Sequence, residues 1–181
     1  MNLIEKRVEN FRALKSQEEN IVKAAAIILA ALLNGNKILF CGNGGSASDA
    51  NHLAAEFISK FKLERASLPA ISLSSNNSII TAIANDYDFE RVFSRQIEGL
   101  GDEDDVLIGI STSGKSKNVL KAFEEAKKRG IKTIFLTGKN KTEAGVSLEI
   151  NVPSEVTAEI QEMHIAIGHI LAEFVEKQMV K

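Results

Sequence analysis

Short apolar runs alternate along the chain with longer segments in which apolar positions recur every three to four residues. The short runs have the length of buried strands, and the longer segments have the period of helices. The predicted strands cover residues 37–41, 70–73, 106–110, 133–136 and 148–152. Strands that alternate with helices predict an α/β fold built on a parallel sheet.

Two further helical patterns precede the first strand, within residues 2–33. Ser-Gln-Glu-Glu at residues 16–19 reads as a capping box for the second helix, which Asn34 and Gly35 would end. We therefore expect a helical hairpin over residues 1–34, which could cover the sheet or pack on another subunit. The remaining residues, 35–181, are expected to form the α/β core and a long closing helix from residue 154, within a single domain 1–181.

Composition narrows the class of partner. The chain is 44% hydrophobic and 25% charged, and its formal net charge of −2 argues against a nucleic-acid surface. A small polar substrate is the natural alternative. The single cysteine, Cys41, excludes an intramolecular disulfide and fits a reducing cytoplasm. No apolar run reaches the roughly 18 residues of a transmembrane helix, so we expect no membrane association and a cytoplasmic location.

The first predicted strand runs into a glycine-rich turn. Residues 42–45 read Gly-Asn-Gly-Gly, and Ser46 or Ser48 can cap a following helix that carries Asp49 in its first turn. Such a turn leaves backbone N–H groups at a helix start, where an anion such as phosphate binds. Glycine-rich turns are common in α/β proteins, so the turn alone does not define a site.

A histidine and a glutamate follow on the same helix. His52 and Glu56 are four residues apart and therefore lie one above the other on one helix face. A His–Glu pair can bind a metal or move a proton, although many such pairs are only surface hydrogen bonds. The anion-binding turn that leads directly into the pair favours a functional site.

The third predicted strand ends in a turn rich in hydroxyls at the start of a helix. The hydroxyl side chains are Ser111, Thr112, Ser113 and Ser116. Together with backbone N–H groups they suit one phosphate monoester. Residues 109–116 also match the Walker A pattern of nucleotide triphosphatases. Two observations argue against that reading: Gly109 falls inside the strand, and no acidic residue follows strand 133–136 to hold magnesium.

The closing helix carries an amide and two histidines. Gln161 and His169 are about 80° apart around the helix axis, whereas His164 lies about 60° to the other side of Gln161. The two histidines are therefore not expected to serve one site, and His164 is expected to be structural. If the two helices meet over the carboxyl end of the first strand, Gln161 and His169 would join His52 and Glu56 beside the hydroxyl turn.

The combined motifs resemble the sugar isomerase (SIS) domain family and, within it, the phosphoheptose isomerases. The resemblance spans essentially the whole chain, with motifs at residues 41–56, 85–87, 93–96, 109–116 and 160–169. It implies a three-layer, flavodoxin-like sandwich with five parallel strands, and a homotetramer with sites near subunit interfaces. It also implies conversion of sedoheptulose 7-phosphate to D-glycero-D-manno-heptose 7-phosphate, the first step toward ADP- or GDP-heptose for bacterial surface polysaccharide.

The resemblance further implies roles for individual residues. The phosphate would be held by Ser111, Thr112, Ser113 and Ser116. The sugar would be lined by Asn43, Gly44, Gly45, Ser46, Glu56, Asn85, Asp86 and Gln161. One zinc ion per subunit would be bound by His52, Glu56, Gln161 and His169. Isomerisation needs one base and one acid on opposite sides of an enediol, and these would be Glu56 and His169.

Four positions depart from the family pattern. Lys60 and Glu159 stand where the family usually has Arg, Asn76 where it has Asp, and Asp88 where it has Gly. Lysine cannot form the bidentate fork of arginine, and glutamate reverses the charge beside Gln161. These changes bear on substrate choice rather than on the fold.

A non-catalytic member of the family is the alternative. Such a protein would bind a sugar phosphate or a partner protein, as the family's replication-initiator-associated member does. The presence of Glu56, Gln161 and His169 favours the enzyme.

Overall fold

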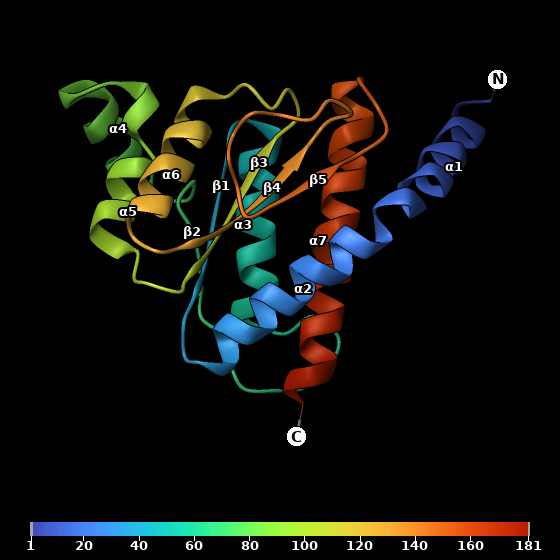
Figure 1. The fold of residues 1–181 in the computed structure, drawn as a ribbon, viewed down its shortest axis with the longest axis horizontal. Coiled ribbons are helices and arrows are strands. Elements are labelled where there is room, and N and C mark those ends of the chain that lie inside the picture. Colours follow the sequence, from blue (N-terminus) through green and yellow to red (C-terminus); the bar gives the residue numbers. More distant parts are fainter. Residues whose placement is uncertain (1, 181) are drawn as a thin grey trace.

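The computed structural model describes residues 2–180, which contain a sheet of five parallel strands in the order β2-β1-β3-β4-β5 (Figure 1). The strands are β1 (Ile38–Gly42), β2 (Ala70–Ser72), β3 (Val106–Ser111), β4 (Lys132–Thr137) and β5 (Leu148–Asn151). Each overlaps a predicted strand, so the predicted α/β class and parallel sheet are confirmed. The strand order reverses between β1 and β3, as in flavodoxin-like folds.

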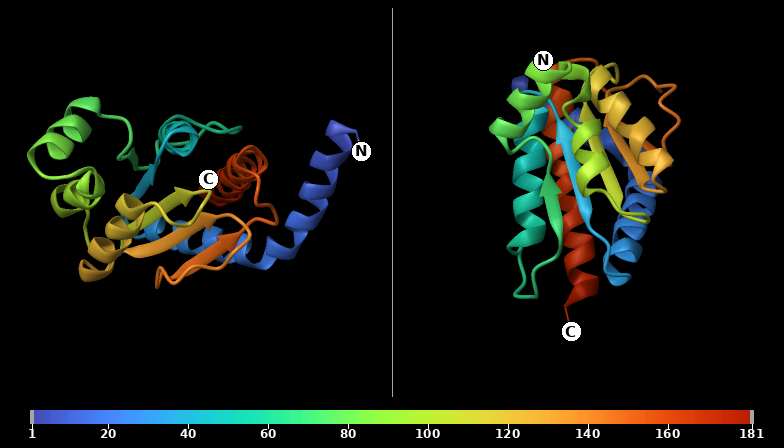
Figure 2. Two further views of the ribbon diagram at one scale, coloured as in Figure 1. Left: turned by 90° about the horizontal axis from the view of Figure 1, so that it is seen from above. Right: turned by 90° about the vertical axis from the view of Figure 1, so that its left-hand side faces the viewer.

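Helices cover both faces of this sheet, as the predicted three-layer sandwich requires (Figures 1 and 2). One face carries α2 (Glu18–Leu33), α3 (Gly45–Ile58) and α7 (Thr157–Met179), and the other carries α4 (Asn77–Asp86), α5 (Ser94–Leu100) and α6 (Lys117–Lys128). Successive strand residues point to opposite faces, so Ile38 and Phe40 enter one core while Leu39 and Cys41 enter the other. Burial on both faces explains why β1 and β3 read as continuous apolar runs.

The N-terminal helices do not form the predicted hairpin. Helix α1 (Leu3–Leu14), a 3₁₀ turn (Lys15–Gln17) and α2 follow one bent path, and α1 extends away from the sheet in Figure 1. The expected capping box is also absent, because no side chain caps the start of α2. The N–H of Glu18 donates to the carbonyl of Lys15 instead. The near-helical turn supplies the acceptors that a side chain would otherwise provide, and no glycine or proline there reverses the chain.

Two other element boundaries differ from the prediction. The segment expected to form one helix from residue 89 to 100 divides into a 3₁₀ turn (Phe89–Arg91) and α5. The closing helix begins at Thr157 rather than at residue 154, and its expected end at residue 181 lies outside the described residues. Within residues 2–180, no helix is both long and apolar enough to cross a membrane.

Candidate active site

A polar cavity of about 300 Å³ lies at the carboxyl ends of β1 and β3, where the strand order reverses. It is lined by the turn after β1, the turn after β3 and the first turns of α7, with side chains or backbone from Asn43, Gly44, Gly45, Ser46, Ile110, Ser111, Thr112, Ser116, Thr157 and Gln161. Open α/β sheets bind ligands at this point of the topology. The two loops singled out in the sequence therefore meet at one site.

The glycine-rich turn brings α3 to this cavity. Gly44 has a φ of 56°, in the left-handed region that glycine adopts most readily. The helix begins at the next residue, Gly45, and the amide of Gln161 lies against this first turn. The N-terminus of α3 and the side chain of Gln161 thus reach the cavity together.

The predicted cap of α3 is wrong. Neither Ser46 nor Ser48 provides a side-chain cap at the N-terminus of the helix, and Asp49 lies beyond its first turn. The hydroxyl of Ser48 instead donates to the carbonyl of Gly44 at 3.5 Å. Without a capping side chain, the positive end of the helix dipole faces the cavity and favours an anion.

The hydroxyl turn after β3 contributes three of its four predicted side chains to the cavity. The hydroxyls of Ser111 and Ser116 lie 2.9 Å apart, and Thr112 lines the same space. Ser113 lines a neighbouring cavity of about 130 Å³, and its hydroxyl accepts a hydrogen bond from the N–H of Lys115. Ser113 therefore does not line the cavity of Ser111 and Ser116, whereas Thr112 lines both cavities.

The reasons given against a triphosphatase hold in the structure. Gly109 lies inside β3, where it pairs with Phe135 of β4, so it is not part of the loop. Strand β4 ends at Thr137, and Gly138 follows. The Walker-like pattern therefore arises from a strand residue followed by a short loop, and no carboxylate stands at the end of β4 to hold magnesium.

A pair of amides joins the two loops, and sequence reasoning missed it. The side chains of Asn43 and Asn118 exchange two hydrogen bonds of 2.9 and 2.8 Å, and Asn118 is buried. The Asn118 carbonyl oxygen also accepts the N–H of Val119 in the first turn of α6. The one signal for this pair in the sequence was the position of Asn118, an amide in the first turn of the helix that follows the hydroxyl turn.

A second polar group lies in the contact between α3 and α7. Nε2 of His52 is 2.9 Å from Nε2 of His169 and 3.3 Å from Oε1 of Glu56. One donor atom from each of the three residues lies within 4.8 Å of the others, a spacing suited to a metal ion. The helices approach closely here because Gly168 has no side chain, and a Cβ at this position would collide with Leu53.

The sequence had suggested that this His–Glu cluster lies beside the hydroxyl turn. In the structure, none of its three residues lines the cavity that contains that turn. Helices α3 and α7 run side by side in the same direction, since Gly45 contacts Gln161 and Leu53 contacts Gly168 (Figure 2). His52 lies seven residues after Gly45, which places the cluster about 10 Å along α3 from the cavity. Gln161 lies at the cavity end of the same contact, about 12 Å along α7 from His169.

The predicted sugar-binding residues Asn85 and Asp86 lie elsewhere. They form the end of α4 on the opposite face of the sheet, and neither lines the cavity. Both are exposed, and the Asn85 amide donates to the Asp86 carboxylate at 2.9 Å. Within one chain, the sheet separates them from the His–Glu cluster.

His164 has the structural position expected of it. Its side chain is fully buried, and its Nε2 donates to the carbonyl of Thr137 at the end of β4. Burial lowers the pKa of His164 to about 4, and the hydrogen bond offsets only part of this effect. The prediction that His164 and His169 point in different directions is confirmed.

The four departures from the family pattern take local structural roles. The Asn76 carbonyl oxygen caps α4, as an aspartate would, and Asp88 has an extended backbone that needs no glycine. Lys60 pairs with the carboxylate of Glu64 four residues later at 2.6 Å. Glu159 is buried and accepts a hydrogen bond from Ser154, so its charge does not line the cavity.

Comparisons with known proteins agree with this architecture. The model of the SIS domain family matches residues 4–138. Phosphoheptose isomerase from a Nitratiruptor species is 58% identical over 160 residues, which cover 87% of this chain and 86% of that protein. The same enzyme from Helicobacter pylori is 52% identical over 168 residues, which cover 92% and 88%.

Solved structures give the same result. Phosphoheptose isomerase from Neisseria gonorrhoeae superposes with a TM-score of 0.87 at 39% identity, covering 96% of this chain and 95% of that chain. The enzyme from Francisella tularensis superposes with a TM-score of 0.88 at 35% identity, covering 96% and 94%.

Proposed function

Because the chain belongs to the SIS domain family, and within it to the phosphoheptose isomerases, we propose that the cavity and the His–Glu cluster form one active site. The reaction is the interconversion of sedoheptulose 7-phosphate and D-glycero-D-manno-heptose 7-phosphate, a step in heptose precursor synthesis. The observation that carries this assignment is the distance between the polar cavity and the His–Glu cluster. The two lie about 10 Å apart along the contact between α3 and α7.

The spacing suits a seven-carbon substrate. Ser111, Thr112 and Ser116 would hold the phosphate on C7, together with the N-terminus of α3. The sugar chain would extend from there along the contact between α3 and α7, past Gln161, toward C1 and C2 at the His–Glu cluster. A shorter sugar phosphate anchored in the same cavity would place its reacting carbons short of Glu56.

Proton transfer would use the two ends of the cluster. The Glu56 carboxylate takes a proton from C1 of the ketose and returns it to C2. His169 donates a proton to the oxygen on C2 and later accepts the proton from the oxygen on C1, which completes the aldose. Nε2 of His169 lies 2.9 Å from Nε2 of His52. Because this nitrogen is held by His52, or by zinc when it is bound, the exchanged proton would be carried on Nδ1 of His169.

The same cluster fits a zinc ion. Two imidazole nitrogens and one carboxylate oxygen are a donor set of catalytic zinc sites, which keep a further position open. His52, Glu56 and His169 would hold one ion per subunit. Gln161, the fourth ligand that the family resemblance implies, lies in this structure at the cavity end of α7, against Gly45. Bound zinc would polarise the substrate carbonyl and lower the free energy of the enediolate.

A homotetramer is the proposed assembly, and the cytoplasm is the proposed compartment. An apolar groove of about 420 Å³ lies between the N-terminal helices and α7, lined by Phe11, Leu14, Ile21, Val22 and Ile170 among others. Exposed apolar surface of this kind is typical of subunit interfaces. Assembly would also allow Asn85 and Asp86, which are exposed in one chain, to reach the sugar site of another subunit.

The test is turnover of sedoheptulose 7-phosphate by purified protein. We expect Glu56→Gln and His169→Gln each to lower kcat about 10²–10⁴-fold with little change in KM, because loss of a general base or acid has this cost. His164→Gln is the control and should keep its turnover. A chelator should inhibit the enzyme, and added zinc should restore it.

Two outcomes would contradict the proposal. Near-normal turnover in Glu56→Gln would exclude the proton-transfer role. Binding of the sugar phosphate without turnover in the unmodified protein would instead favour the non-catalytic alternative.

A further inference from the structure

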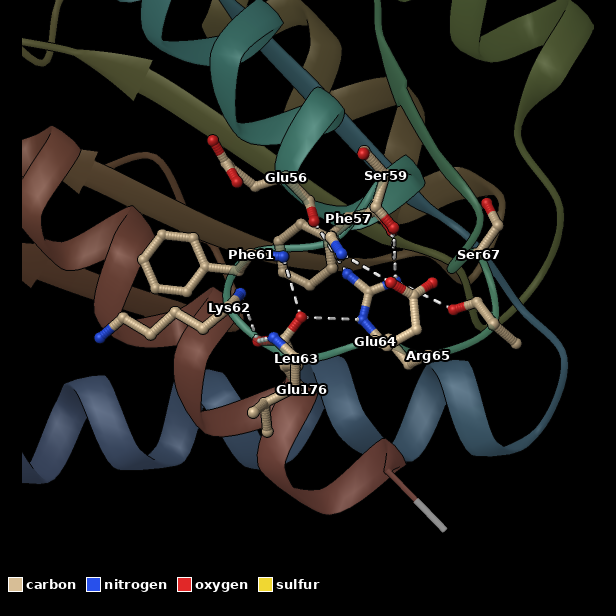
Figure 3. Close-up of polar contacts among 12 residues, drawn as sticks. Glu56, Phe57, Ser59, Phe61, Lys62, Leu63, Glu64, Arg65, Ser67 and Glu176 are labelled. Atoms are coloured by element: carbon tan, nitrogen blue, oxygen red, sulfur yellow. Dashed lines mark hydrogen bonds and ion pairs between the residues drawn. The ribbon is translucent and has the colours of Figure 1, made fainter.

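The loop between α3 and β2 is held by a buried carboxylate (Figure 3). Glu176 of α7 has a side chain that is only 2% exposed. Its two oxygens accept the backbone N–H groups of Phe61, Lys62 and Leu63 at 2.8, 2.7 and 3.0 Å. Three consecutive N–H groups on one carboxylate fix the path of the loop relative to α7.

A buried arginine connects the same carboxylate to the end of α3. The Arg65 side chain is 3% exposed, and its Nε lies 3.4 Å from Oε1 of Glu176. Its other two nitrogens donate at 2.8–3.2 Å to the carbonyls of Glu56, Phe57, Ser59 and Ala66. The last carbonyls of a helix have no partner within the helix, and a positive charge there is attracted by the negative end of the helix dipole. Arg65 therefore caps the helix turn that carries Glu56.

The loop also contacts the second proposed catalytic residue. The Phe61 ring lies 5.3 Å from the His169 ring, centroid to centroid, and is tilted by 36°. The backbone of this same Phe61 is bound by Glu176. One ion pair is thus connected to Glu56 through its carbonyl and to His169 through the Phe61 ring.

Stability alone does not explain the two buried charges. Removing two charges from water is costly, and well-packed apolar residues of similar size are often at least as stabilising as a buried pair. Hydrogen bonds to specific carbonyls and N–H groups are directional, so they fix the position of the backbone. Apolar packing is not directional and does not do so. Here the positions defined are those of Glu56 and of the Phe61 loop.

We propose that Arg65 and Glu176 are positioning residues that hold the Glu56 carboxylate and the His169 imidazole in the geometry needed for proton transfer. This inference rests on the catalytic roles proposed above for Glu56 and His169. A displacement of about 1 Å in a catalytic group costs up to about 10²-fold in rate. The anion cavity lies at the other end of α3 and does not contact the ion pair.

The test is the kinetics of Glu176→Gln, which keeps the shape of the side chain and leaves Arg65 without its counter-charge. We expect kcat to fall about 10- to 100-fold while KM stays within about twofold of the unmodified enzyme. Glu173→Gln is the matched control, because Glu173 lies one turn earlier on α7 and binds only the exposed Lys62 and Lys177. It should leave both constants unchanged. Equal kcat values for Glu176→Gln, Glu173→Gln and the unmodified enzyme would overturn the proposal.

A second measurement separates positioning from a loss of stability. The chain has three histidines, so ¹³C-labelled rings can be assigned by substitution. Because the Phe61 ring lies 5.3 Å from the His169 ring, we expect its ring current to shift the His169 resonance. Glu176→Gln should move that resonance while the buried His164 resonance stays in place. An unmoved His169 resonance would overturn the proposal even if activity falls.

A second variant guards against misfolding of Glu176→Gln. Phe61→Leu keeps both buried charges and should lower kcat with an unchanged KM. Unchanged kcat in this variant would exclude the link through Phe61. The resonance experiment needs no turnover, so it reports on the ion pair even if Glu56→Gln shows that the proposed catalytic roles are wrong.

Discussion

The buried His164 should make the protein lose stability in mild acid. Its pKa is about 4 in the folded chain, against an ordinary value of 6.5, because burial disfavours the charged ring. Its contribution to stability is therefore complete above pH 6.5 and is lost as the pH falls toward 4. The unfolded chain binds a proton in this window that the folded chain does not. At about 1.4 kcal/mol per pH unit, the loss between pH 6.5 and pH 5 is about 2 kcal/mol.

The comparison that isolates this effect uses His164→Gln. Glutamine does not titrate, and its amide can still donate to the carbonyl of Thr137. Other groups also respond to acid, among them Glu176, whose pKa is lowered because backbone hydrogen bonds outweigh its burial. These groups are present in both proteins, so their effects cancel in the difference.

The assay is urea unfolding of both proteins at pH 7, 6 and 5. Protein concentration must be equal throughout, because assembly adds to apparent stability. We expect the stability advantage of the unmodified protein over His164→Gln to shrink by about 2 kcal/mol from pH 7 to pH 5. If the free energies of unfolding of the two proteins fall in parallel with pH, the reasoning is refuted. Parallel curves would show that the pKa of His164 is the same in the folded and unfolded chains.

Two further predictions concern the cavity and the assembly. Ser111→Ala combined with Ser116→Ala should raise KM for the sugar phosphate about 10²–10⁴-fold, since each of the two lost hydrogen bonds to a charged group contributes about 1.5–3 kcal/mol. Unchanged affinity for phosphate-bearing ligands would refute the phosphate site. Calorimetry should also detect no magnesium-dependent binding of ATP. Light scattering should give about four times the chain mass of 19.7 kDa, and a monomer at micromolar concentration would exclude the tetramer.

Local patterns in the sequence were sufficient for the sheet and for the location of the cavity. Apolar runs of strand length identified β1 and β3, which are buried at every position because helices cover both of their faces. The edge strand β5 was found although Leu148 and Ile150 alternate with Glu149 and Asn151. Parallel strands place their carboxyl ends at one edge, so the glycine turn after β1 and the hydroxyl turn after β3 had to come together. Helical periodicity was likewise enough to separate His164 from His169.

Features that depend on contacts between distant segments were decided only by the tertiary structure. The continuous course of α1 into α2 depends on the few residues of the 3₁₀ turn, where helix continuation and a capped restart have similar sequence signals. The bond between Asn43 and Asn118, and the approach of α3 to α7 at Gly168, join residues far apart in the chain.

The ion pair of Arg65 and Glu176 is the clearest case of a feature that the sequence alone could not predict. Nothing in the local sequence distinguishes these two from other charged residues, most of which are exposed. Their burial follows from the packing of the loop after α3 against α7, which no periodic pattern records. Local periodicity determines which residues form each element, whereas side-chain partners are determined by how elements distant in the chain pack together.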